Sequence, residues 1–449
     1  MAMQSKKKIM IAAIAGSMAA ALIIGGGSFA FLKDNAETIT NNFKTNKVQV
    51  AIDETDGKNK QYQYNIIPGT EESKNPVAYI TTTVPAYLFV TITDETDDLV
   101  TYEVITGENG WTKLDGKDNV YYRTVEAKEG QQNFNILKDN KVSYDSGIEN
   151  KDMAGKDDIK LSFDVFGIQQ AGFADAAAAY AQAPTKVSNQ EELNAALANA
   201  KDGDTIQLAP NETPYKLPAD IPNINLFGSD PKTTFVNATA LNHSTNNRSF
   251  DLDAENVTFK YDDEYYAEDN TNTKARTLAM NGSGTFKNCV FDGSTRDAIR
   301  DVRLTGDLVF EDCTINGRVY GLNVGGGATT GNVVVKNCDI YGWNSFGASG
   351  TGTVTFEGCR FHKSSSQGYL RFYQDAKVTN CTFDEEFEAV DILKDGLTIE
   401  MTGCTGLPTT KLHNTFNENK PDVKYTAKWI INGEVFNVPE DQRTGASAS

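Results

Sequence analysis

A short hydrophobic pattern repeats through the C-terminal half of the chain, centred each time on a cysteine. An apolar residue stands three positions before the cysteine, and in five of the six copies a Phe or Ile stands two positions after it. The copies are centred on Cys289, Cys313, Cys338, Cys359, Cys381 and Cys404. Their spacing of about 23 residues is a period at which repeats stack as the coils of a solenoid.

The residue before each cysteine is of a type that tolerates a left-handed backbone, so each coil is expected to bend sharply there. These residues are Asn288, Asp312, Asn337, Gly358, Asn380 and Gly403. Before one bend Val354 and Phe356 alternate with polar residues, and after it Cys359 and Phe361 do the same. This is the period of strands with one buried face, and the whole pattern predicts a parallel β-helix.

The cysteines are predicted to stack inside this β-helix as free thiols, because identical positions on successive coils lie about 4.8 Å apart. A disulfide between adjacent coils is the alternative, since that separation is near the range that a disulfide permits. Stacked side chains run parallel instead of facing each other, which favours the free thiols. A zinc site is disfavoured because the cysteines form no C-x-x-C pair and no row of histidines accompanies them.

The segments that flank the repeats predict how the β-helix begins and ends. Ser188 and Glu191 form a capping box, and the helix after it is predicted to plug the open end of the core with one apolar face. That face consists of Leu193, Ala196, Leu197 and Ala200. At the other end, Val423 to Val438 is predicted to close the β-helix as a hairpin with Asn432 and Gly433 at its turn.

Residues 203–208, 215–218 and 224–228 give an order of short strands directly after the predicted plug helix. This order resembles the first coils of pectate-lyase-like right-handed β-helices. The resemblance implies the right-handed fold of that family and not its activity.

The N-terminus predicts a secretory signal peptide. Three lysines at positions 6–8 precede an apolar run over residues 9–24, which is short for a membrane span. Ser28 and Ala30 are the small residues that a signal peptidase needs, so the mature chain is predicted to start at Phe31. A retained anchor helix is the alternative.

Residues 25–43, with the run 48–52 and the later strands 87–92 and 161–165, resemble the TasA/camelysin family of exported proteins. The resemblance implies a jelly-roll-like β-sandwich that polymerises by lending an N-terminal strand to the next subunit, which is β-augmentation of an exposed edge. The donor strand would run from Phe31 through Ile39 to Phe43. The chain departs from the family by carrying a large second domain. Some relatives are described as metalloproteases, but no H-E-x-x-H occurs here, so protease activity is not carried over.

The sequence therefore predicts an all-β chain with an N-terminal jelly-roll-like β-sandwich and a right-handed parallel β-helix that begins with a capping helix. An Ala-rich segment ends at Pro184, which stops a helix and marks a linker. The predicted regions are a signal peptide over 1–30, the β-sandwich over 31–183, the β-helix over 184–440 and a disordered tail over 441–449.

The net charge of −19 argues against nucleic acid or anionic surfaces as partners. No cofactor is predicted. An acidic exported protein can bind calcium, but no D-x-[DN]-x-[DN]-G loop occurs. The expected location is outside a bacterial cell, with contact to the membrane only through an uncleaved signal peptide.

Catalytic side chains, if present, are expected at the outward positions of the strand that follows each bend. The alignment of these positions gives a row of Asp301, Asn323, Gly347, Arg371 and Asp391. A glycosidase needs two carboxyls about 5 to 9.5 Å apart, whereas four coils separate Asp301 from Asp391 by about 19 Å. Arg371 and Asp391 are predicted to form a cross-strand ion pair.

The stretch 292–303 mixes carboxylates and arginines as a polysaccharide lyase would, but it is interpreted as a solvated charged loop. The three histidines, His243, His362 and His413, are isolated, because none has an acidic residue three or four positions away. Tyr320, Tyr341, Trp343, Tyr369 and Tyr373 could stack on sugars or could serve packing. The candidate glycan contacts are Asn323, Trp343, Arg371 and Tyr373.

These observations favour a non-enzymatic exported protein that assembles into surface or matrix fibres and displays the β-helix as an adhesin or spacer. Self-association is then the main partnership, with a polysaccharide or host glycan as a further partner. A secreted polysaccharide lyase or hydrolase is the second hypothesis. A glycan-binding module without chemistry is the third.

Overall fold

The structure is a computed structural model that describes residues 48–54, 65–156, 159–238, 241, 250–261, 276–294, 297–324, 331–346, 352–414 and 425–439. The predicted signal peptide with Ser28 and Ala30, the predicted donor strand with Phe31, Ile39 and Phe43, and the predicted tail lie outside the described residues. The chain divides into two compact units between Ala183 and Pro184, each with its own core.

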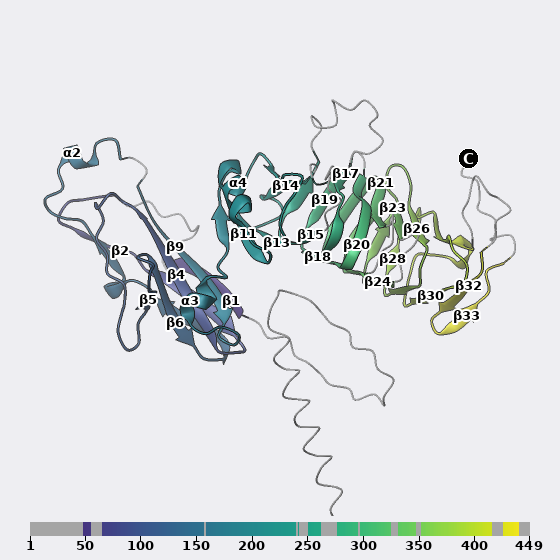
Figure 1. Cartoon of the computed structure of the whole chain (residues 1–449), viewed down its shortest axis with the longest axis horizontal. Helices are drawn as coiled ribbons and strands as arrows, with labels where there is room; N and C mark the ends of the chain where they lie inside the picture. The colour runs from purple at the N-terminus through teal and green to yellow at the C-terminus, as the bar shows by residue number, and fades with distance from the viewer. Residues whose placement is uncertain are drawn as a thin grey trace, which may run out of the picture. The chain divides into compact units, whose positions relative to one another are not determined.

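The first unit consists of antiparallel sheets (Figure 1). One sheet has the order β1 (Val48–Glu54), β3 (Pro76–Thr82) and β7 (Lys128–Asn135), and another has β5 (Thr112–Lys113), β6 (Val120–Val125), β4 (Ala86–Glu95) and β9 (Lys160–Gln169). β2 (Glu71–Ser73) pairs with β8 (Lys141–Ser143). The short helical segments are η1 (Lys138–Asn140), α2 (Asn150–Met153) and α3 (Ala176–Tyr180).

The two larger sheets of this unit pack face to face as a sandwich. Leu88 and Val90 point into the core between them, as does Ile80 from the opposite sheet. The approach is close at Gly167 in β9, where an added Cβ would lie 2.4 Å from a methyl of Val50 in β1. On the outer face of the larger sheet, Phe89 packs beneath α3. Because successive side chains of a strand point to opposite faces, each sheet can bury one face in the core of the sandwich.

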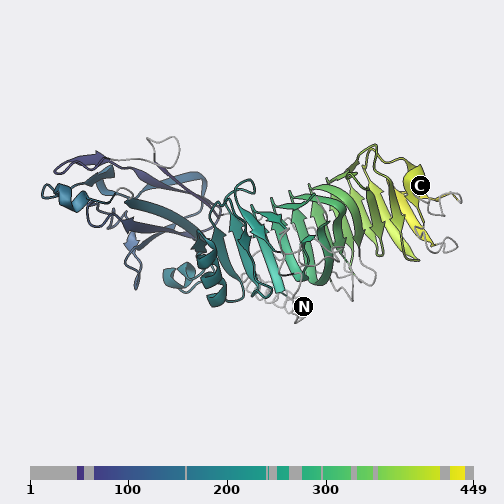
Figure 2. The ribbon, with the colours of Figure 1, turned by 90° about the horizontal axis from the view of Figure 1, so that it is seen from above.

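The second unit is a right-handed parallel β-helix whose coils stack one after another (Figure 2). The strand pairing places its strands on three faces. The first face precedes the cysteine bend in each coil. Its strands are β10 (Thr185–Val187), β11 (Asp204–Leu208), β13 (Ile224–Gly228), β15 (Phe250–Glu255), β18 (Asn281–Lys287), the end of β20 (Asp297–Glu311), β22 (Val333–Lys336), β24 (Val354–Glu357), β27 (Ala376–Thr379), β30 (Leu397–Thr402) and β32 (Ala427–Ile431). Each pairs in parallel with the next.

The second and third faces follow the bend. The second consists of β12 (Tyr215–Lys216), β14 (Phe235–Asn237), β16 (Thr258–Lys260), β19 (Val290–Gly293), the starts of β21 (Thr314–Val324) and β23 (Asp339–Phe346), β25 (Arg360–His362) and β28 (Thr382–Phe383). The third consists of β17 (Arg276–Leu278), the start of β20, the ends of β21 and β23, β26 (Tyr369–Phe372), β29 (Ala389–Ile392) and β31 (Leu412–His413). The segment η3 (Thr409–Lys411) precedes β31.

The predicted bends are confirmed at all six positions. Asn288 has φ of 47°, and the other five have φ between 52° and 65°. Asn256, one coil earlier, has φ of 59° and extends the series to a coil without cysteine. A left-handed residue turns the chain sharply at low cost only if it is Gly, Asn or Asp, and these are the residues found there.

The interior is the predicted stack of cysteine and apolar side chains. Five cysteines are buried and all six are free thiols, and Phe286, Phe310, Phe356 and Phe361 are fully buried beside them. The rings contact one another from coil to coil: Phe286 stacks on Phe310 with 5.2 Å between centroids. One continuous core therefore runs along the β-helix.

The two ends of the β-helix agree with the prediction except in one detail. α4 (Gln190–Asn199) begins one residue later than expected, because Asn189 is the N-cap and its side chain accepts a hydrogen bond from Glu192 N. Leu193 and Leu197 are buried as predicted. At the other end β32 and β33 (Glu434–Phe436) form the predicted hairpin through Asn432 and Gly433. None of the helices described in the chain has the length and apolar character of a membrane span.

Candidate functional site

The third face of the β-helix carries two outward rows of side chains that the strand register defines. In one row Tyr320, Trp343 and Tyr369 are aligned, and in the other Asn323, Ser345, Arg371, Asp391 and His413 are aligned. The sequence alignment was wrong in placing Gly347 between Asn323 and Arg371, since Ser345 has that place. The strand register shifts within β21 and where β21 pairs with β20. The outward positions therefore do not lie at a constant number of residues after each cysteine. Gly347 and the side chain of Asp301 lie outside the described residues.

Asp391 is bound from both sides along its row. Its Oδ2 accepts a hydrogen bond from Arg371 Nε at 3.0 Å, which confirms the predicted ion pair. Its Oδ1 lies 3.0 Å from His413 Nδ1. Asp391 and Arg371 are both buried, although they point outward from the coil. A charge removed from water in this way is tolerated only when it is paired and hydrogen-bonded.

The same face carries a stack of rings and guanidinium groups, which we term the aromatic–arginine strip: Arg300, Tyr320, Trp343, Arg371 and Tyr369. Tyr320 and Trp343 stack with centroids 4.7 Å apart and an interplanar angle of 24°. Arg371 Cζ lies 3.9 Å from the centre of the Trp343 ring and 4.5 Å from that of Tyr369. Arg300 Cζ lies 4.4 Å from the centre of Tyr320. These are distances at which cations are attracted to ring faces.

The interpretation of residues 292–303 as a solvated charged loop was wrong for the part around Arg300. Asp297 to Arg303 lie in β20 and do not form a solvated loop. Asp297 is buried, and it accepts hydrogen bonds from Arg300 at 2.8 Å and from Tyr320 N at 3.2 Å. Burial raises the pKa of Asp297, with these hydrogen bonds opposing the rise. The dense charge in this stretch therefore fixes one end of the ring stack.

The remaining candidate glycan contacts border this strip. Asn323 and Tyr373 are half-buried. Burial raises the pKa of Tyr373, while the nearby charge of Arg371 opposes the rise. The indole Nε1 of Trp343 has no hydrogen-bond partner among the described residues.

A second polar cluster lies on the neighbouring face around His362. Its Nδ1 lies 2.9 Å from Asp384 Oδ2, its Nε2 lies 3.1 Å from Asp339 Oδ1, and its ring stacks on Tyr341 at 4.3 Å. Arg360 Nε also lies 2.7 Å from Asp339 Oδ1. Burial by itself raises the pKa of Asp339, but the hydrogen bonds from His362 and Arg360 outweigh it and lower that pKa.

The prediction that the histidines are isolated was wrong for His362 and His413. Their acidic partners are 22 or 23 residues away in sequence, which is one coil. A search at three or four residues suits a helix, whereas the neighbours of a residue in a β-helix lie one repeat away. Pairs of His and Asp at the repeat period are the signal that could have found them. His243 lies outside the described residues.

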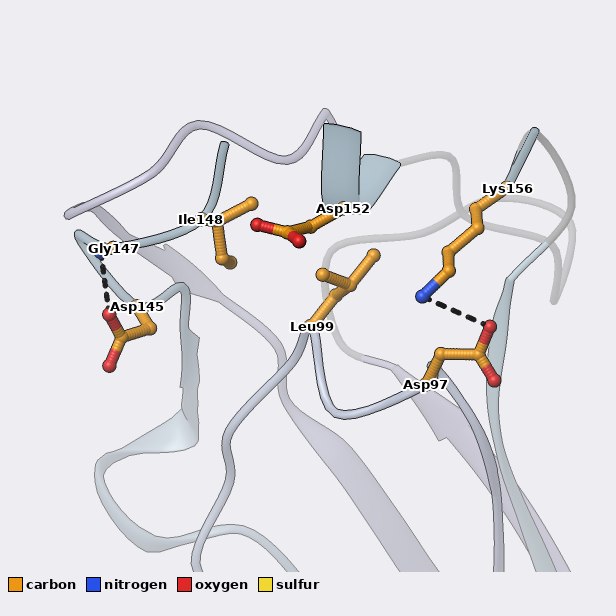
Figure 3. A pocket seen from close by; sticks show the side chains of 7 residues that line it. All are labelled: Asp97, Leu99, Asp145, Gly147, Ile148, Asp152 and Lys156. Carbon is orange, nitrogen blue, oxygen red and sulfur yellow. Dashed lines mark hydrogen bonds and ion pairs between the residues drawn. The ribbon is translucent and has the colours of Figure 1, made fainter. Parts of the chain in front are cut away.

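An open depression of about 380 Å³ lies in the first unit (Figure 3). Its lining residues are Asp97, Leu99, Asp145, Gly147, Ile148, Asp152 and Lys156. Lys156 pairs with Asp97 at 3.3 Å, and Asp145 accepts a hydrogen bond from Gly147 N. Among the residues that the structure describes, no group of three His, Cys, Asp or Glu side chains is suited to hold a metal ion.

Residues 277–434 match a family model described as a right handed beta helix region. A comparison with curated proteins finds no match. Among solved structures, the Agl-KA catalytic domain is 12% identical, with 80% of this chain and 75% of that chain covered and a TM-score of 0.33. The catalytic unit of the thermostable GH87 alpha-1,3-glucanase from Streptomyces thermodiastaticus strain HF3-3 is 11% identical, with 86% and 93% covered and a TM-score of 0.27. At these values the likeness carries no argument about function.

Proposed function

We propose that this protein is an exported, non-catalytic glycan-binding protein whose β-helix serves as a rigid adhesive rod. The observation that carries the proposal is the aromatic–arginine strip. Tyr320, Trp343 and Tyr369 lie half-buried in one outward row, where their faces contact one another or a guanidinium and the Nε1 of Trp343 is buried. Rings with an apolar body and a polar tip are suited to sugars, which are amphipathic in the same way.

The stack also makes the strip rigid before any ligand arrives. Trp343 is held between Tyr320 and Arg371, and Arg371 is in turn held by the buried carboxylate of Asp391. Binding to side chains that are already ordered avoids about 0.5 to 1.5 kcal/mol of entropy cost for each one. A weak, repeated carbohydrate contact gains most from such preorganisation.

Binding is favoured over cleavage by the state of the acidic side chains near the strip. Asp391 is shared by Arg371 and His413, and Asp297 is bound by Arg300. A glycosidase needs one carboxyl that donates a proton and another that acts as base or nucleophile. Proton transfer from Asp391 would first require breaking a buried ion pair, which is costly, and Asp297 would have to release Arg300.

The binding test compares wild type with Trp343→Ala in affinity electrophoresis through gels that contain neutral or uronate-containing polysaccharides. We expect a ligand that retards the wild type and binds the variant about tenfold more weakly, a loss of about 1.4 kcal/mol. The control is Phe227→Ala, which removes an exposed aromatic ring from the first face of the same β-helix.

Because Trp343→Ala also opens the ring stack, Tyr369→Phe provides a second variant that keeps the ring and removes only its hydroxyl. The same polysaccharides are assayed for new reducing ends and for unsaturated uronates. Release of either product by the wild type would overturn the non-catalytic proposal. Equal retardation of wild type and Trp343→Ala by every ligand would remove the strip from the proposal.

Display at the cell surface and self-association are also proposed, on the strength of the N-terminal sequence. The observation that supports self-association is that β1 pairs only with β3 among the described strands and so forms an edge of its sheet. An edge strand can accept a strand from another chain. Electron microscopy of chains that start at Phe31 or at Val48 tests this. We expect filaments only from the longer chain, and monomers from both would refute donor-strand assembly.

A further inference from the structure

The cysteine stack ends differently from the way it begins. Cys289, at the first end, is buried above Val257 of the preceding coil, and Cys313 to Cys381 are buried as well. Cys404, the last of the series, is only partly buried. The reason is that β32 turns back through Asn432 and Gly433 into β33, so its coil does not continue past the bend.

The strand pairing that follows Cys404 is shorter than that after the cysteines before it. β30 ends at Thr402, and beyond the bend only an isolated bridge joins Thr405 to Thr382. That bridge places Cys404 directly beside Cys381, and Thr405 N donates a hydrogen bond to Cys381 O at 2.9 Å. The thiol of Cys404 leans toward the preceding coil, where its Sγ lies 3.3 Å from Val378 O.

We infer that Cys404 is a site of thiol modification by low-molecular-weight disulfides, and that Cys381 resolves the adduct into a disulfide between the last two coils of the stack. Neighbouring strands are about 4.8 Å apart, which is within the Cα separation that a disulfide allows. This goes beyond the proposed glycan binding and does not depend on it.

Apart from the disulfide reagent, the reaction uses only the thiols of Cys404 and Cys381. The thiolate of Cys404 attacks a reagent R–S–S–R, forms a mixed disulfide and releases one R–S⁻. The thiol of Cys381 loses its proton and attacks Cys404 Sγ, so that the second R–S⁻ leaves. Two protein thiols are oxidised and one reagent disulfide is reduced to two thiols. The hydrogen bond from the Cys381 thiol lowers the pKa of Cys404 to about 7, which favours the first step. Hydrogen bonds to Cys359 and Cys404, together with burial, raise the pKa of Cys381, so Cys404 and not Cys381 attacks the reagent first.

The test treats the native full-length protein with oxidised glutathione, blocks the remaining thiols with an alkylating agent and maps tryptic peptides by mass spectrometry. Cleavage after Lys377, Lys394 and Lys411 separates Cys381 from Cys404. We expect one linked pair of peptides, 378–394 with 395–411, and alkylated thiols at the other four cysteines. Cys381→Ser is expected to stop at the glutathione adduct on Cys404.

Two controls keep the inference falsifiable. Cys404→Ser should abolish the fast reaction, whereas Cys289→Ser, at the buried end of the stack, should leave it unchanged. If all six thiols react at one slow rate, access requires unfolding of the β-helix and the inference is wrong. It is equally wrong if the wild type keeps a stable glutathione adduct on Cys404 without forming the linked peptides.

Discussion

The interior and the outer surface of the same coils are built in opposite ways. Inside, each coil supplies nearly the same residues, so Phe286 meets Phe310 and each cysteine lies beside the next. Outside, on the second and third faces, most rows change residue from coil to coil, and some of their members are joined as specific pairs such as Arg371 with Asp391. The interior thus gains stability from many equivalent contacts, whereas the outer surface depends on single contacts that nothing adjacent can replace.

The largest expected effect comes from breaking the buried pair on the outer surface. Asp391→Ala leaves Arg371 buried without its carboxylate, and we expect the free energy of unfolding of the β-helix to fall by about 3–5 kcal/mol. Exposure of the buried cysteine thiols in urea measures this, because the first unit contains no cysteine. The probe therefore reports on the β-helix alone, which matters because a chain of two units need not unfold in one step.

The double variant Arg371→Met with Asp391→Leu removes both charges. We expect it to be more stable than Asp391→Ala, because a hydrophobic pair avoids the desolvation of charge. The control is Asp384→Asn, whose carboxylate is half exposed and whose loss should change stability by less than about 1 kcal/mol. An Asp391→Ala effect no larger than this control would show that the outer pair is not a specific support.

How far the sequence could predict each region follows from the same contrast. The sequence could predict the bends, such as those at Asn288 and Gly403, and the stacked cysteines. The residues of the interior repeat in every coil, so the pattern of one coil predicts the structure of the others. The Asp391–His413 and Asp339–His362 pairs were missed because their partners are one coil away in the sequence and not three or four residues away. The place of Ser345 beside Arg371 could not be predicted, since the register changes within β21. The start of the capping helix was misplaced by one residue because Ser188 and Asn189 are both good caps.

The next effect in size tests the bend that joins the interior to the outer surface. Asn337 has φ of 52°, and Asn337→Ala places a residue with an ordinary Cβ in the left-handed region at a cost of about 1–2 kcal/mol. Asn337→Gly is the matched control, because glycine adopts this conformation freely. We expect a clear loss of stability in urea for the alanine variant and a smaller one for the glycine variant. Equal losses would mean that the Asn337 side chain, and not the backbone angle, supports the bend.

A smaller effect should follow from trimming the interior itself. Ile340→Val removes one buried methylene from the core and is expected to cost about 0.5–1.5 kcal/mol. Ile430→Val, at a half-buried position in β32, is the control and should cost less. The same urea titration with thiol exposure measures both. A larger loss for Ile340→Val than for Asp391→Ala would reverse the contrast between the two regions.

The smallest expected effect is a pH-dependent change in stability, and it comes from Asp339 on the outer surface. The pKa of Asp339 is lowered in the folded protein by the hydrogen bonds from His362 and Arg360, which outweigh the effect of burial. A carboxyl with a lowered folded pKa contributes stability above its unfolded pKa, near 3.9. That contribution is lost as pH falls through the folded pKa. Asp339→Asn should therefore be less stable than wild type at pH 7, and the difference should shrink toward pH 3. Because Asp339 is partly exposed, salt should also reduce the difference at pH 7. A difference that is constant with pH would mean that Asp339 supports the coil by packing and not through its charge.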